Sequence, residues 1–304
     1  MGRAAASAAG IAGVLMSTAA CNMANLGNAS APATPYTSNG LCTQYLNPTM
    51  PTSTGTQTPS GFPVQMRGVV LAPASSSATL ASAYTQFNNV TCTKYSHAYS
   101  YRPPRFYYYD CVGFTGYAVR QADPTAWNSV MNAVHLRTYW NVPTPLAFET
   151  FFNSLKTTPQ PNWRAVATVR NIRAGDVLAW QPANANGTPN TSGVGHSVMP
   201  LVAPRAILGS NGTRWEVVVM DSTAGGHGPQ DTRKPNNPLS QRNDPIKTTS
   251  GQVQASGLGI GTIALDTNAS GQVTGVEWNV GNKPEPIVFG AGRALAGGTA
   301  PARS

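Results

Sequence analysis

The sequence predicts an α+β protein in which helices pack on an antiparallel sheet that forms later in the chain. Apolar residues recur at helical spacing between positions 114 and 155, whereas β-branched runs separated by turn residues follow position 161. Helices and strands that are segregated along the chain are typical of α+β domains. We therefore expect a helical layer covering an antiparallel sheet.

Four helices are predicted. The first covers 75–87, and the second begins at Cys111. Each of the other two begins with an N-cap residue followed by proline, at Asp123-Pro124 and at Thr144-Pro145. The apolar stripes of these two helices are Trp127, Val130, Met131 and Val134 in one, and Phe148, Phe151, Phe152 and Leu155 in the other.

Strands are predicted mainly in the second half of the chain. Asn211-Gly212 is a strong signal for a hairpin turn, and Pro200 indicates a sheet edge or a bulge. The expected strands are 66–71, 174–180, 195–202, 214–221, 259–265 and 273–280. The expected loops are 93–104, 184–195 and 224–243.

The ends of the chain are predicted to lie outside the main domain. Residues 1–20 have the basic start, apolar stretch and small residues of a secretory signal peptide, which implies a secreted, periplasmic or cell-envelope location. Cleavage there would leave Cys21 first, and lipidation of this residue is an open alternative. We expect residues 21–65 to form a Ser/Thr/Pro-rich linker, residues 66–292 to form the main domain, and residues 293–304 to form a flexible tail.

The charge of the chain is positive but dispersed. The net charge is +9 over 304 residues and no run of Lys or Arg occurs, so no nucleic-acid partner is predicted. A loose attraction to cell-wall polyanions and plain solubility are the two open readings. No apolar run after the signal peptide approaches the roughly 20 residues that span a bilayer, so the expected membrane attachment is only through Cys21.

The four cysteines limit the disulfide pattern. Removal or lipidation of Cys21 leaves three, an odd number in an oxidising compartment. A Cys42–Cys92 disulfide would leave Cys111 as a free thiol, and a Cys92–Cys111 disulfide is the alternative. No Cys-x-x-Cys occurs, so neither a structural zinc site nor any other metal or cofactor is predicted.

The segment 106–117 holds the candidate nucleophile. Phe114, Tyr117 and Ala118 follow Cys111 on one helical face, which places this cysteine at a helix N-terminus. Unpaired N–H groups and the helix dipole stabilise a thiolate there. The alternative is an inert core cysteine. Asp110 is expected to cap the helix.

Four segments resemble one family. Segment 110–115, Asp-Cys-Val-Gly-Phe-Thr, resembles the nucleophile motif of NlpC-type papain-like cysteine peptidases and their CHAP amidase relatives, with Val112 in place of the usual Ser. Segment 173–180 resembles their turn and first strand, with Ala174 in the Pro position. Segment 195–198 resembles the strand with the catalytic histidine, and 217–223 lies where the family carries its third polar residue.

The resemblance implies a function. It implies a papain-like catalytic domain in a monomeric bacterial enzyme that hydrolyses an amide in peptidoglycan or a related peptide. The nucleophile, base and orienting residue would be Cys111, His196 and Asp221. Two alternatives are a catalytically lapsed cell-envelope binding module on the same fold, and a thiol acyl or amide transferase.

The remaining polar residues have lesser expected roles. His97, His135 and His227 are the rivals of His196, and His227, in a loop expected to be mobile, could contact substrate. The backbone N–H of Cys111 and a Tyr107 or Tyr109 hydroxyl are candidate oxyanion donors, and Asp110 is a further candidate contact. The hairpin turn alone would leave His196 too far along its strand from Asp221, so a bulge at Pro200 or a longer loop is expected to shift the register.

Overall fold

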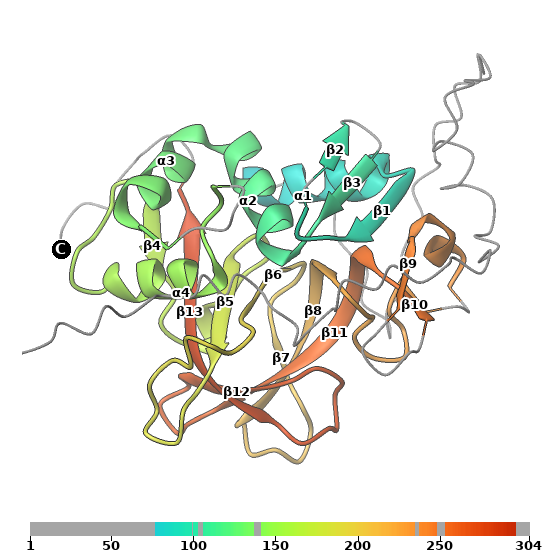
Figure 1. Cartoon of the computed structure of the whole chain (residues 1–304). Coiled ribbons are helices and arrows are strands. Elements are labelled where there is room, and N and C mark those ends of the chain that lie inside the picture. Colours follow the sequence, from blue (N-terminus) through green and yellow to red (C-terminus); the bar gives the residue numbers. More distant parts are fainter. Residues whose placement is uncertain are drawn as a thin grey trace, which may run out of the picture.

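The computed structural model describes residues 77–98, 100–102, 106–136, 141–234, 237–247 and 253–295. The predicted signal peptide, the linker and the strand at 66–71 lie outside the described residues, as do Cys21 and Cys42. In the part of the chain that is described, the protein is α+β, which confirms this level of the prediction: helices cover one end and side of an antiparallel barrel (Figure 1). None of the described helices is long and apolar enough to cross a membrane.

All four predicted helices form. Their bounds are α1 Ala78–Asn89, α2 Cys111–Ala122, α3 Pro124–Ala133 and α4 Pro145–Ser154. The side chains of Asp110, Asp123 and Thr144 accept hydrogen bonds from backbone N–H groups of the first turn, and the prolines occupy the first position of α3 and α4. Local capping chemistry therefore determines where these helices begin.

Six antiparallel strands form a closed barrel. They are β5 Val177–Pro182, β6 His196–Pro200, β8 Arg214–Thr223, β11 Gly257–Thr267, β12 Val273–Glu277 and β13 Glu285–Ala294. The pairings run β11-β12-β13-β5-β6-β8, and a ten-residue pairing of β8 with β11 closes the ring. Two short strands extend this sheet, β4 Trp163–Ala165 beside β13 and β7 Arg205–Ala206 beside β8.

The remaining elements lie around the barrel. They are the strands β1 Cys92–Tyr95, β2 Ser100–Arg102, β3 Phe106–Tyr109, β9 Pro245–Lys247 and β10 Val253–Ala255, and the short helices η2 Val169–Asn171 and η3 Pro238–Arg242. The prediction of a loop over 93–104 was wrong, because β1 and β2 both pair with β3 there. These strands are only three or four residues long, which is too short for a clear alternating pattern.

The last strand was also missed. β13 runs to Ala294, so the predicted boundary of the flexible tail at 293 falls inside a strand. Its glycines explain the error, because a Gly-rich run reads as tail. A Cβ at Gly290 would lie 2.6 Å from the backbone oxygen of Glu149, and one at Gly292 would collide with the ring of Phe152. The glycines therefore let α4 pack directly on this strand.

The two faces of β8 belong to two apolar clusters. Val218 and Met220 pack with the helices, whereas Val217 and Val219 face the interior of the barrel. The alternation follows from the two-residue period of a strand. It sets Asp221 on the interior face, next to the helical layer.

The predicted register shift is present. The hairpin turn has positive φ at both central residues, 51° at Asn211 and 76° at Gly212. Arg205 then pairs with Glu216, but Pro200 pairs with Val219. Between these two pairings the segment before the turn advances two residues more than β8 does. Residues 201–204 absorb this difference.

Candidate active site

Cys111 is the first residue of α2. Asp110 caps the helix by accepting a hydrogen bond from the Gly113 N–H on its Oδ1, at 2.9 Å. Cys111 is buried and is not in a disulfide, whereas Cys92 is disulfide-bonded. The alternative Cys92–Cys111 disulfide is therefore wrong, and the predicted partner Cys42 lies outside the described residues. A thiol outside any disulfide at a helix N-terminus is in the environment that favours a thiolate.

Two hydrogen bonds hold α2 against the strands of the site. Thr115 of α2 bonds to Ser197 of β6 through their hydroxyls, at 3.0 Å. Ser222 of β8 donates to the backbone oxygen of Tyr109, two residues before Cys111, at 2.7 Å. Ser197 follows His196, and Ser222 follows Asp221, each on the opposite face of its strand. The two hydrogen bonds therefore fix the start of α2 relative to both strands.

His196 begins β6 and faces the barrel. Its backbone pairs with Trp180 of β5, and its ring contacts the rings of Trp180 and Trp278 at centroid distances of 5.4 and 5.1 Å. The side chain is only 6% exposed. Two indoles therefore confine the imidazole, which restricts its rotation.

The imidazole of His196 meets the carboxylate of Asp221. Met199 pairs with Met220, and extending this register sets Asp221 two residues along from His196 on the same face. Nε2 of His196 lies 2.6 Å from Oδ2 of Asp221. The predicted contact between these side chains is confirmed. Because an ionised carboxylate only accepts, Nε2 carries the proton and Nδ1 is left for the thiol.

The charges of the site support an ion pair. Burial lowers the pKa of His196, but the charge of Cys111, hydrogen bonds to Asp221 and to Cys111, and the charge of Asp221 together raise it to about 9. Burial raises the pKa of Asp221, but Arg233, His227 and His196 hold it well below its usual range. An imidazolium at His196 is therefore favoured at neutral pH, and its positive charge would stabilise a thiolate at Cys111.

His227 and Arg233 also bind Asp221. Nε2 of His227 lies 2.8 Å from the same Oδ2, and Nη1 of Arg233 lies 2.8 Å from Oδ1. Both side chains are buried, whereas the sequence suggests a loop in which His227 could contact substrate. Sequence reasoning missed Arg233. Its signal is the acid–base pair Asp231 and Arg233 in a chain with only 10% charged residues.

The other candidates lie elsewhere. His97 Nδ1 is 3.0 Å from Oδ2 of Asp110, and His135 is exposed. The Tyr109 hydroxyl is fully buried and donates to Gln86 of α1 at 2.8 Å. Tyr109 is a candidate oxyanion donor from the sequence, but in the structure its hydroxyl proton is donated within the helical layer.

The site also resembles a set of metal ligands. One ligand atom each from His196, Asp221 and His227 lies within 4.8 Å of the others. The contacts of 2.6 and 2.8 Å between Nε2 and Oδ2 atoms are those of hydrogen bonds, however. The guanidinium of Arg233 on Oδ1 also opposes a cation at this carboxylate. The donor set therefore fits a hydrogen-bond network better than a metal centre.

Comparison with known proteins identifies no relative: no family model, no curated protein and no solved structure matches the chain. Its assignment to a class of protein therefore depends on the geometry of Cys111, His196 and Asp221.

Proposed function

We propose that the protein is a cysteine hydrolase of the NlpC/CHAP type that cleaves an amide bond in peptidoglycan or a related peptide. The observation that carries the proposal is the chain of contacts from the Cys111 thiol at a helix N-terminus, through His196, to a buried Asp221. The fold fits a papain-like assignment, because the helix that begins with the thiol packs on neighbouring strands that carry the histidine and the aspartate.

The chemistry follows from these positions. His196 takes the thiol proton on Nδ1, and the thiolate attacks the amide carbonyl carbon to form a tetrahedral intermediate. We expect the backbone N–H of Cys111 to donate to the oxyanion. The imidazolium then gives its proton to the leaving amine, and a thioester forms. Water, deprotonated by His196, hydrolyses the thioester and restores the thiol.

The substrate class rests on the resemblance and on charge. The motifs around Cys111 and His196 resemble those of cell-wall hydrolases, and the net charge of +9 would favour an anionic envelope polymer. The test is mass spectrometry of peptidoglycan fragments after incubation with the protein. New amide-cleaved fragments should form with the wild type and not with Cys111→Ala, which removes the nucleophile and leaves the apolar face of α2 intact.

A second candidate is the catalytically lapsed binding module. The burial of the reacting groups favours it, since Cys111 and Asp221 are fully buried and His196 is 5% exposed. Alkylation by iodoacetamide separates the two. An activated Cys111 should react with iodoacetamide at pH values well below the ordinary thiol pKa of about 8.5, and an inert thiol should not.

A further inference from the structure

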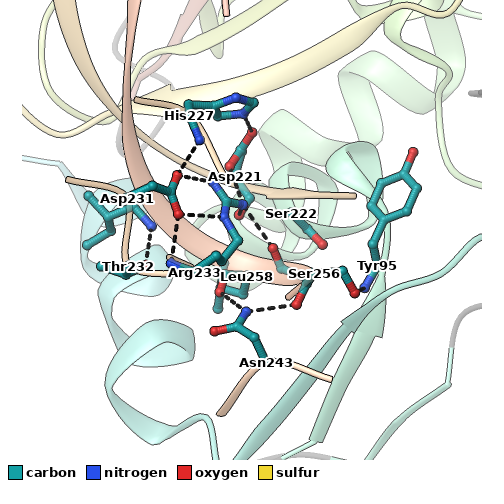
Figure 2. Close-up of polar contacts among 12 residues, drawn as sticks. Tyr95, Asp221, Ser222, His227, Asp231, Thr232, Arg233, Asn243, Ser256 and Leu258 are labelled. Carbon is teal, nitrogen blue, oxygen red and sulfur yellow. Dashed lines mark hydrogen bonds and ion pairs between the residues drawn. The ribbon is translucent and has the colours of Figure 1, made fainter. Parts of the chain in front are cut away.

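A buried arginine lies on the side of Asp221 that faces away from the histidines. Nη1 of Arg233 donates to Oδ1 of Asp221 at 2.8 Å (Figure 2). It also donates to the backbone oxygen of Gly257 at 3.0 Å. Oδ2 of the same carboxylate accepts from His196 and His227. Both carboxylate oxygens are thus occupied, and rotation of the carboxylate would break contacts on both sides.

Asp231 holds this arginine in place. Its two oxygens accept from Nε and Nη2 of Arg233, at 2.8 and 2.7 Å, which is the forked geometry that fixes a guanidinium plane. Asp231 also accepts from the backbone N–H of His227 at 2.7 Å. Figure 2 shows Arg233 between the two aspartates. One carboxylate therefore positions both of the groups that reach Asp221 from this loop.

Strand β11 makes room for the ion pair. A Cβ at Gly259 would lie 2.6 Å from Nε of Arg233, and one at Gly261 would collide with Asp231. Leu258 and Ile260, which alternate with these glycines, pack in the helical cluster. At Gly259 and Gly261 the strand thus carries no side chain on the face where Arg233 and Asp231 lie.

We propose that Arg233 is a positioning residue that acts through Asp221: clamped by Asp231, it keeps Asp221 ionised and turned toward His196. This inference rests on the proposed function. A buried carboxylate without a cation tends to take up a proton, and a protonated Asp221 could no longer hold His196 in the tautomer that leaves Nδ1 to the thiol. Arg233 would touch no substrate.

The experiment measures iodoacetamide alkylation of Cys111 in the full chain as a function of pH. In Arg233→Met the acid limb of the rate profile should move up by about one pH unit or more, because Asp221 takes a proton at higher pH. Arg233→Lys should shift it less, since lysine keeps the charge and loses the fork. The charged and titratable groups that face Asp221 are His196, His227 and Arg233, with Asp231 behind them.

A matched control is Arg214→Met. Arg214 forms a forked ion pair with Glu277 at the other end of β8, and its loss should leave the acid limb in place. Asp231→Asn keeps the size of the clamp and loses its charge, so it decides the matter if the Arg233 variants do not fold. Asp231→Asn should move the acid limb of the rate profile to higher pH, by less than Arg233→Met does.

The outcomes separate the two proposals. A wild-type thiol that reacts only near the ordinary pKa of about 8.5 contradicts the proposed function. An activated wild-type thiol whose acid limb is unchanged in every folded variant of Arg233 and Asp231 contradicts the positioning role alone.

Discussion

Two histidine–aspartate pairs lie beside Cys111, and they differ in what holds the aspartate. In the first, His196 and Asp221 come from neighbouring strands, their contact is 2.6 Å, and both side chains are almost completely buried. In the second, His97 and Asp110 come from the loop after β1 and from the cap of α2, their contact is 3.0 Å, and His97 is 35% exposed. The charge of Cys111 raises the pKa of both imidazoles.

The difference lies in the second oxygen of each carboxylate. Oδ1 of Asp221 is bonded to a buried guanidinium that other groups hold in place. Oδ1 of Asp110 is bonded to the backbone of Gly113, where it caps the helix. The same two residue types thus give an oriented pair in one place and a helix cap with a half-exposed histidine in the other. The partner of the second oxygen, a buried guanidinium for Asp221 and a helix N–H for Asp110, therefore distinguishes the two pairs.

Replacing each histidine should show the largest difference. His196→Ala should lower kcat/KM for peptidoglycan cleavage roughly 10³-fold or more, because it removes the general base. His97→Ala should lower it by less than about tenfold if His97 has no general-base role. Fragment release measured by mass spectrometry decides between them. Equal losses in the two variants would mean that the pairs share one role.

Replacing each aspartate should give two different kinds of effect. Asp221→Asn should lower kcat roughly 10²- to 10⁴-fold with the fold intact, since an amide favours the wrong tautomer of His196. Asp110→Asn should leave the stability nearly unchanged, because asparagine caps helices as well as aspartate does. Asp110→Ala should cost about 1 kcal/mol of unfolding free energy. Urea unfolding and steady-state kinetics on the same samples measure both, and a wild-type kcat in Asp221→Asn would refute the triad.

The titration of the two imidazoles should differ in its dependence on the thiol. The pKa of His196 is raised from 6.5 to about 9, so its stabilising contribution is complete below pH 6.5 and is lost as the pH rises through about 9. NMR of the imidazole protons should give that midpoint. In Cys111→Ser the midpoint of His196 should fall, because the largest cause that raises it is removed.

In the same variant the pKa of His97 should change less. The hydrogen bond to Asp110 and the charge of Asp110 each raise the pKa of His97 more than the charge of Cys111 does. A larger shift at His97 than at His196 would place the thiolate beside the wrong histidine.

The smallest effect on kcat is expected from replacing Tyr109, which ends β3 and whose hydroxyl donates to Gln86 of α1. Tyr109→Phe should cost about 1 kcal/mol of stability, because it leaves the buried Oε1 of Gln86 without its hydrogen-bond donor. It should leave kcat within about twofold of the wild type, since the hydroxyl proton is donated to Gln86 of α1. A loss of kcat as large as that of an oxyanion donor, about 10²-fold or more, would restore its predicted role.

The sequence by itself determined the local features of this protein. Asp110, Asp123 and Thr144 fix the helix starts, because a cap needs only the residues of one turn. The hairpin turn at Asn211-Gly212 and the inward face of Asp221 are likewise local, since they follow from positive φ and from the two-residue period of a strand. The order of helices and strands gave the α+β class.

The tertiary structure decided what depends on contacts between distant segments. The shift at 201–204 sets the distance between His196 and Asp221, and its size could not be read from the turn. Arg233 is buried because the glycines of β11 make room for it and two aspartates match its charge. A strand pattern shows which face a residue lies on, but only packing shows which distant partner it meets there.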